Sequence, residues 1–341
     1  MNILVLDVAA SESGALSILQ EYYRNFKIDH DNQYLFCIST PELCSTNNIQ
    51  VLSFPWVKKS WFHRIWFEVF YVNKIVKQFK IDRVFSLENL ILSNPKCEKW
   101  IYLHMAVPFI DVRFSIMQDP LMWVYQNIMD KFIISSLRNA DKIIVQTQWM
   151  KDACIKVAHL QAKSVTVQPP QIQESEAVHC VKRSDVRNTL FYPATALNYK
   201  NHFRLLSALK QMQNHGTLGD LCLNLTLSGD ENTLAKKLFS FVADNHLPVK
   251  FLGKLPKAQV VQLYASSTLI FPSYVETFGL PLLEARKADT LILASNCSFS
   301  REILSDYDAV TYFNPLDTNE ICATIEKHLS IQATSDRNTK K

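Results

Sequence analysis

Two glutamates eight residues apart enclose a compact Phe-Gly-Leu-Pro sequence, in the stretch Glu276-Thr-Phe-Gly-Leu-Pro-Leu-Leu-Glu284. A carboxylate accepts hydrogen bonds from two hydroxyl groups at once, so each glutamate is suited to hold a sugar. The backbone N–H groups of Phe278, Gly279 and Leu280 would stand at a helix start, where they suit an anion such as a diphosphate. The pattern therefore indicates a site for both hydroxyl groups and phosphates.

The surrounding residues predict the elements that would position this stretch. The apolar run 269–271, closed by Pro-Ser, is typical of a buried strand with a defined end. Pro281 would stand near the first position of the next helix, where its missing N–H costs little. Gly279 lets the backbone approach a ligand and tolerates a positive φ angle. With a further strand at 291–294, the unit places its loop at the sheet edge where α/β proteins bind ligands.

The segment from Glu276 to Glu284 resembles the donor-site signature of the retaining family 4 glycosyltransferases, in which two glutamates enclose a Phe-Gly-Leu-Pro core. Taken singly, two such glutamates would be ordinary solvated carboxylates beside a helix start, but the ordered context favours the site. The resemblance covers nearly the whole chain and is densest at 190–205 and 249–315. It implies an α/β chain with the GT-B fold, in which two facing Rossmann-like, doubly wound domains enclose an interdomain cleft.

The resemblance also implies roles for residues of the second half. Glu284 would hold the ribose hydroxyls of a nucleotide-sugar donor, UDP- or GDP-linked, and Glu276 would act on the transferred sugar as a catalytic residue. The N–H groups of residues 278–280 would receive the diphosphate, so no metal ion is needed. The loop at Lys254 and Leu255 would lie against the nucleotide base.

Lys200 stands between a predicted strand and a predicted helix, where it could reach a phosphate as a point charge. Most surface lysines have no specific role, but this one stands where the family has its phosphate-binding lysine. The family also has an arginine about six residues earlier, where this chain has Ala194 and Thr195. Loss of that guanidinium removes a bidentate phosphate contact. Either another cation such as Lys254 or Arg301 replaces it, or donor binding is weaker.

Two residues of the first half are further candidates. His104 ends a predicted inner strand; a lone histidine there is more often structural, but the family places a histidine near the transferred sugar. An imidazole could hydrogen-bond a hydroxyl group or support charge in the transition state. Gly14 stands in a polar strand-to-helix turn, which is either a plain helix start or the family's ligand-facing loop. The family usually has two adjacent glycines there, whereas this chain has Ser13-Gly14.

The segment 56–70 interleaves three tryptophans and three phenylalanines with two lysines, an arginine and a histidine. Basic residues among aromatics fit a helix that lies on an anionic membrane face. The alternative is an amphipathic helix that packs Trp61, Ile65 and Val69 into the core. Both interpretations are compatible along one helix.

The length of 341 residues, with 48% hydrophobic and 20% charged residues, predicts two domains with ample cores. The net charge of +4 does not argue for nucleic acid. The 8 cysteines form no CxxC pair, so we expect reduced thiols and no zinc site. The first residues are too short and too acidic for a signal peptide, and no apolar run is long enough to span a membrane. We expect domains at 1–170 and 188–330, a linker at 171–187 and a frayed tail at 331–341.

Together these features predict a retaining hexosyltransferase that moves a sugar from a nucleotide-sugar to a lipid-linked or oligosaccharide acceptor, in capsule, exopolysaccharide or other surface polysaccharide synthesis. Its expected location is cytoplasmic, with possible peripheral contact at the inner face of the plasma membrane through 56–70. Two alternatives stay open. A sugar-nucleotide epimerase on the same fold would need no acceptor, and a non-catalytic partner subunit would account for the missing arginine.

Overall fold

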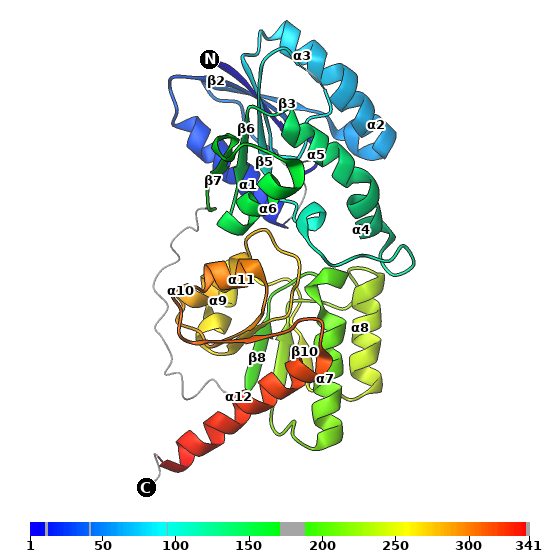
Figure 1. The fold of residues 1–341 in the computed structure, drawn as a ribbon, viewed down its shortest axis with the longest axis vertical. Coiled ribbons are helices and arrows are strands. Elements are labelled where there is room, and N and C mark those ends of the chain that lie inside the picture. Colours follow the sequence, from blue (N-terminus) through cyan, green and yellow to red (C-terminus); the bar gives the residue numbers. More distant parts are fainter. Residues whose placement is uncertain (11–12, 41, 94, 171–187, 339–341) are drawn as a thin grey trace. The chain divides into compact units, whose positions relative to one another are not determined.

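The computed structural model describes residues 1–10, 13–40, 42–93, 95–170 and 188–338. Contacts within the chain divide it into two compact units, Met1–Ile172 and Gln173–Lys341, and each is described by itself (Figure 1). The predicted linker at 171–187 lies outside the described residues. None of the described helices has the length and apolar character needed to cross a membrane.

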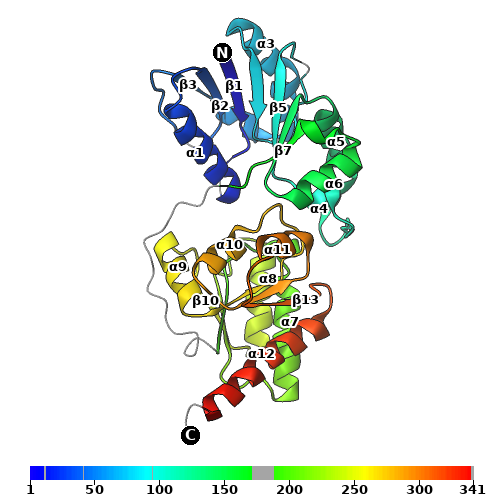
Figure 2. The ribbon, with the colours of Figure 1, turned by 60° about the vertical axis from the view of Figure 1, so that its left-hand side comes forward.

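The first unit is built on a seven-stranded sheet with the strand order β3-β2-β1-β4-β5-β6-β7, in which every pair of neighbours is parallel (Figure 2). Its strands are β1 (Asn2–Asp7), β2 (Gln33–Ile38), β3 (Ile49–Ser53), β4 (Arg83–Ser86), β5 (Glu98–Leu103), β6 (Lys142–Val145) and β7 (Val165–Val167). Its α-helices are α1 (Ser13–Lys27), α2 (Trp61–Trp66), α3 (Val72–Gln78), α4 (Pro120–Val124), α5 (Asp130–Arg138) and α6 (Gln148–Ala158). Nearly continuous apolar strands explain why both faces of this sheet are covered.

Two π-helical segments interrupt the helices of the first unit. The first π segment, Phe67–Tyr71, joins α2 to α3, and the second π segment, Tyr125–Met129, joins α4 to α5. A π turn inserts one extra residue and so shifts which side chains face inward. Such turns are frequent at functional sites.

The second unit has a six-stranded parallel sheet with the order β10-β9-β8-β11-β12-β13. The strands are β8 (Thr189–Tyr192), β9 (Cys222–Leu225), β10 (Val249–Phe251), β11 (Thr268–Phe271), β12 (Ile292–Ser295) and β13 (Val310–Phe313). The helices are α7 (His202–His215), α8 (Thr233–Asp244), α9 (Lys257–Ala265), α10 (Leu280–Lys287), α11 (Ser298–Ile303) and α12 (Thr318–Asn338). The last helix packs against α7 and continues to Asn338, into the segment 331–341 that the sequence predicted to be a frayed tail (Figures 1 and 2).

Each sheet has one point where the order of its strands reverses. In the first unit this switch point lies between β1 and β4, and in the second it lies between β8 and β11. The loops that leave neighbouring strands in opposite directions open a crevice at the carboxyl ends of the strands, where doubly wound folds bind ligands. The two switch points therefore locate the candidate sites.

For the aromatic segment 56–70, the structure contradicts the interpretation that Trp61 and Ile65 pack into the core. Trp61 is 46% exposed and Ile65 is 49% exposed, so neither packs into the core. The first π segment instead turns Phe67 and Glu68 inward, where both are fully buried. The outward face carries exposed aromatic side chains, which are those of Trp61, Phe62, Trp66 and Phe70.

Candidate active site

The switch point of the second unit brings together a lysine and a glutamate that are far apart in the sequence. Lys200 follows β8 and Glu276 follows β11, and the lysine Nζ lies 2.5 Å from the glutamate Oε1. Their side chains are only 16% and 15% exposed. The hydroxyl of Ser273 also donates to Glu276 Oε1, at 2.8 Å. Two of the sequence-predicted residues thus meet at the edge where a ligand is expected.

Asn201, immediately after Lys200, explains how the lysine is held. Its backbone has a φ angle of 65°, in the left-handed region that asparagine tolerates better than most residues. Its buried side-chain amide donates to the carbonyl of Pro272 at 3.1 Å and to that of Pro315 at 2.6 Å. These carbonyls belong to the loops that follow β11 and β13. One amide therefore joins three loops at the carboxyl edge of the sheet and fixes the start of α7.

The start of α10 lies beside Glu276 in the same loop. Gly279 has a φ angle of 87°, and a Cβ atom there would lie 3.3 Å from Leu282 Cδ1, so the position favours glycine. The first N–H groups of a helix have no partner within it. Among the described residues, the N–H groups of Phe278, Gly279 and Leu280 donate to no other backbone group. They are available to an anion.

Glu284 lies one turn into α10 and has two partners that the sequence did not reveal. Lys257, the first residue of α9, forms an ion pair with Oε1, and the hydroxyl of Tyr264 donates to Oε2 at 3.1 Å. The glutamate side chain is 15% exposed. Burial, with the negative charge of Glu284 beside it, raises the pKa of Tyr264 well above its usual value, so the phenol stays a donor. The second of the two glutamates predicted from the sequence is thus also held in place.

The cations considered as replacements for the missing arginine have different environments. Arg301 is engaged: its Nε donates to Asn296 at 2.8 Å, and its guanidinium lies 3.7 Å from the centre of the Tyr312 ring. Lys254 is exposed in the loop after β10, and Leu255 beside it is partly buried. Ala194 is buried and uncharged. Lys257 is a further cation of this edge that sequence reasoning missed.

The switch point of the first unit has a charged cluster at the ends of β1 and β4. Asp7 closes β1, and Glu88 follows β4 with its side chain completely buried. Glu88 accepts a hydrogen bond from the N–H of Ala9 at 2.8 Å and pairs with Arg64 of α2 at 2.9 Å. Asp7, Arg64, Glu88 and His104 line a cavity of about 140 Å³. Asp7 and Glu88 were missed by sequence reasoning, although both carboxylates stand at or just after the end of an apolar strand.

Glu68, in the first π segment, adds a third carboxyl group to this region. Its side chain is fully buried, and among the described residues neither carboxyl oxygen has a hydrogen-bond partner. Burial, and then the charge of Glu88, raise the pKa of Glu68 to about 8, although Arg64 opposes the shift. Burial and Glu88 likewise raise the pKa of Asp7 well above its usual value. Glu68 is therefore held mainly in the protonated form near neutral pH, because burial and the charge of Glu88 outweigh the charge of Arg64.

The predicted residues of the first unit lie at the same edge. His104 follows β5, and its Nε2 lies 2.9 Å from the carbonyl oxygen of Leu87, so this nitrogen carries the proton. Burial lowers the pKa of His104, which leaves Nδ1 as an acceptor. Gly14 lies in the first turn of α1, at the carboxyl end of β1. No described contact tests the roles predicted for these two residues.

The comparisons with known proteins agree with this arrangement. Residues 179–341, nearly the whole second unit, match the family described as glycosyl transferases group 1. This match spans just under half of the chain. A segment of 82 residues is 34% identical to the O-antigen chain mannosyltransferase B of Escherichia coli, and it covers 24% of this chain and 21% of the relative. The chain thus aligns with only about a fifth of that relative's length.

Solved structures share the fold over both units of the chain. The sucrose-phosphate synthase of Thermosynechococcus elongatus has a TM-score of 0.70 and 14% identity, covering 97% of this chain and 90% of that one. Anabaena Alr3699/HepE, solved in complex with UDP and glucose, has a TM-score of 0.61 and 16% identity, covering 98% and 95%. The chain therefore has the GT-B fold of two Rossmann-like domains, which confirms the predicted fold class.

Proposed function

We propose that this chain is a retaining glycosyltransferase that transfers a sugar from a nucleotide-sugar, UDP- or GDP-linked, to a lipid-linked glycan in surface polysaccharide synthesis. The observation that carries the proposal is the meeting of Lys200, Glu276 and the start of α10 at one switch point. Cationic, carboxylate and free N–H groups at this edge match the phosphates and hydroxyls of such a donor. The O-antigen relative and the UDP-bound neighbour support the substrate classes.

In the proposed reaction the second domain stabilises the leaving nucleoside diphosphate. Lys200 and the N–H groups of Phe278–Leu280 receive the negative charge that develops as the sugar–phosphate bond breaks. These groups supply positive charge without a metal ion. Glu276 accepts hydrogen bonds from the sugar hydroxyls and faces the oxocarbenium-like carbon, and Glu284 accepts those of the ribose. Lys257, which pairs with Glu284 in the empty site, is the nearest replacement for the absent arginine.

The cavity of the first domain suits hydroxyl groups of the acceptor. Its volume of about 140 Å³ is small, and it offers both acceptors and donors. The Nδ1 atom of neutral His104 accepts a hydrogen bond, and the guanidinium of Arg64 donates one. We propose that these groups orient the acceptor's terminal sugar.

A thermal-shift panel of UDP-, GDP-, ADP- and dTDP-sugars tests the donor site. A ligand that binds only the folded protein raises its stability, by about 2.7 kcal/mol at 100 times Kd. One donor class should raise the Tm, and Glu284→Ala should remove that rise. If no donor shifts the Tm, the proposed donor site is wrong and the partner-subunit interpretation is favoured.

Product analysis tests the reaction itself. With the identified donor and a glycan acceptor, the new linkage should have the anomeric configuration of the donor, as judged by NMR of the product. Inversion would refute the retaining mechanism. Conversion of the sugar-nucleotide without any acceptor would instead favour the epimerase alternative.

We also propose that the outward faces of two helical elements of the first domain contact a membrane. Trp61, Phe62 and Trp66 of α2 are more than two-fifths exposed, and the Trp61 ring lies 6.4 Å from that of Tyr125 in the second π segment. The neighbouring α4–α5 region adds further exposed apolar side chains, which are those of Leu121, Ile128 and Phe132. Aromatic and aliphatic groups beside exposed Lys59 match the interface of an anionic bilayer.

Vesicle binding tests this contact. Trp56 and Lys58, at the start of the segment 56–70, are poor probes because Trp56 packs on Phe67 and Lys58 donates to the carbonyl of Ala10. Phe62→Ser with Trp66→Ser and Lys59→Ser should instead weaken sedimentation with anionic vesicles while preserving the Tm. Ile28→Ser, at another exposed apolar residue, is the control. Equal binding of the triple variant and the wild type would refute the membrane contact.

A further inference from the structure

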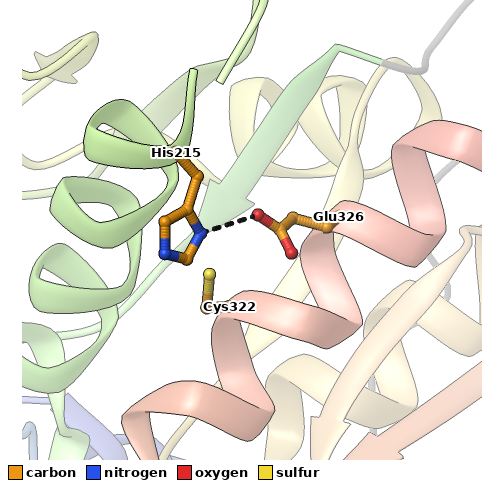
Figure 3. Close-up of side chains that lie close together, drawn as sticks. All are labelled: His215, Cys322 and Glu326. Carbon is orange, nitrogen blue, oxygen red and sulfur yellow. Dashed lines mark hydrogen bonds and ion pairs between the residues drawn. The ribbon is translucent and has the colours of Figure 1, made fainter. Parts of the chain in front are cut away.

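Three side chains of metal-binding type meet where α7 ends against α12. His215 is the last residue of α7, and Cys322 and Glu326 lie on α12 (Figure 3). The ligand atoms of the three residues all lie within 4.8 Å of one another. In Figure 3 the imidazole, the thiol and the carboxylate point toward a common centre between the two helices. No residue of the proposed donor site takes part.

The distance between two of the ligand atoms also fits metal coordination. The Nδ1 atom of His215 lies 3.4 Å from Oε1 of Glu326, which is longer than the usual 2.7–3.2 Å of an N–H···O bond. For bonds of about 2.0–2.1 Å to zinc, the edge of a tetrahedron measures roughly 3.3–3.4 Å. The two atoms therefore already stand at the separation of two zinc ligands. Cys322 and Glu326 are four residues apart, which puts both on the same face of α12.

The surroundings of the three residues also match a built metal site. The hydroxyl of Thr217 donates to Glu326 Oε1 at 2.5 Å, an outer contact that orients the carboxylate. Cys322 is only 3% exposed, whereas the side chain of His215 is 58% exposed. A metal ion could therefore enter from the solvent side and keep a water molecule as its fourth ligand. Mixed nitrogen, sulfur and oxygen ligands favour zinc over calcium or magnesium.

We propose that His215, Cys322 and Glu326 form a zinc site that fastens the last helix to α7. The sequence gave no indication of it, because His215 and Glu326 are 111 positions apart and the cysteines follow no zinc spacing. At its other end, α7 is preceded by its cap residue Asn201, which follows Lys200 in the sequence. The zinc ion would thus stabilise the helix whose first turn positions the donor-site lysine, without touching the donor.

The inference does not depend on the proposed function and is tested by metal binding alone. The full chain, without an affinity tag, is reduced with a phosphine, stripped with a chelator and titrated with ZnCl2 in competition with a fluorescent zinc indicator. His179→Ala with Cys180→Ser provides the background, because these adjacent residues could themselves bind zinc. We expect one zinc ion per chain. At 100 times Kd the Tm should rise by roughly 5–10 °C.

Two variants and one control decide the ligands. Cys322→Ser and His215→Ala should each weaken zinc binding at least about tenfold and remove most of the Tm rise. Cobalt(II) should give a thiolate charge-transfer band in the background protein and not in Cys322→Ser. Cys44→Ser, at an exposed cysteine, should bind zinc normally.

The result that would overturn the site is stoichiometric zinc binding that survives both substitutions, or no zinc binding in the background protein. If Cys322→Ser fails to fold because the residue is buried, His215→Ala alone carries the test. His215 is largely exposed, so its truncation leaves the packing of α7 intact.

Discussion

Lys200→Ala should weaken the binding of the donor's diphosphate and leave the binding of its nucleoside nearly unchanged. The lysine Nζ lies at the switch point beside free N–H groups, and its side chain is only 16% exposed, so its interaction with a phosphate is weakly screened. A hydrogen bond to a charged group contributes about 1.5–3 kcal/mol, which corresponds to roughly 10–150-fold in Kd. Release of the Glu276 pair offsets part of this gain. We therefore expect the lower half of that range for a nucleoside diphosphate.

The assay is calorimetric titration with the nucleoside diphosphate that the donor panel selects and with the matching nucleoside. Lys200→Ala should raise the Kd of the diphosphate about 10–50-fold and change that of the nucleoside less than about twofold. Lys237→Ala, at an exposed lysine of α8, should change neither. An equal loss for both ligands would mean that the substitution distorts the site. An unchanged diphosphate affinity would refute the phosphate role.

Three further predictions concern single residues of the two sites. Glu284→Gln should weaken the binding of a ribonucleotide roughly tenfold and that of its 2′-deoxy analogue less, as measured by calorimetry. Equal losses of affinity would refute the ribose role. Asn201→Ala should lower the free energy of unfolding in urea by roughly 2–4 kcal/mol, and Asn201→Gly, which keeps the positive φ angle, should lower it somewhat less. An unchanged free energy of unfolding would refute the joining of three loops by this amide. The raised pKa means that folded Glu68 keeps its proton between about pH 4.5 and 8 while the unfolded chain releases it, so wild-type stability should fall as pH rises through this window. Glu68→Gln should remove up to about 1.4 kcal/mol per pH unit of that fall, and parallel pH profiles of the two proteins would contradict the buried carboxyl.

The parts of the fold that depend on local sequence could be predicted. Apolar runs bounded by turn residues defined the buried strands, and the loop from Glu276 to Glu284 showed its helix start through Gly279 and Pro281. These features depend on neighbours in the chain, and the two-domain α/β fold follows from their alternation. Lys200 and Glu276 were each predicted in a loop after a strand of the second sheet, but their ion pair was not predicted.

What the sequence could not give are contacts between distant helices. The pairing of Lys257 with Glu284 requires the register of α9 against α10, and the cluster on α7 and α12 requires two helices far apart in the chain. In the aromatic segment the regular helical period misplaced the buried face. The π segment adds a residue, so Glu68 turns inward and Ile65 stays in solvent. A hydrophobic-periodicity argument has no means of finding such an insertion.

Each carboxylate that would receive the donor already has a lysine against it: Glu276 is paired with Lys200 and Glu284 with Lys257. In the proposed function, donor binding would then be an exchange of partners in which the lysines turn to new oxygen atoms, and the two carboxylates would compete with the ligand for the lysines. When the spent nucleotide left, the carboxylates would pair with the lysines again. The same two pairs that keep the empty site in order would therefore lower the affinity for product and favour its release, which is often the slow step of an enzyme's turnover.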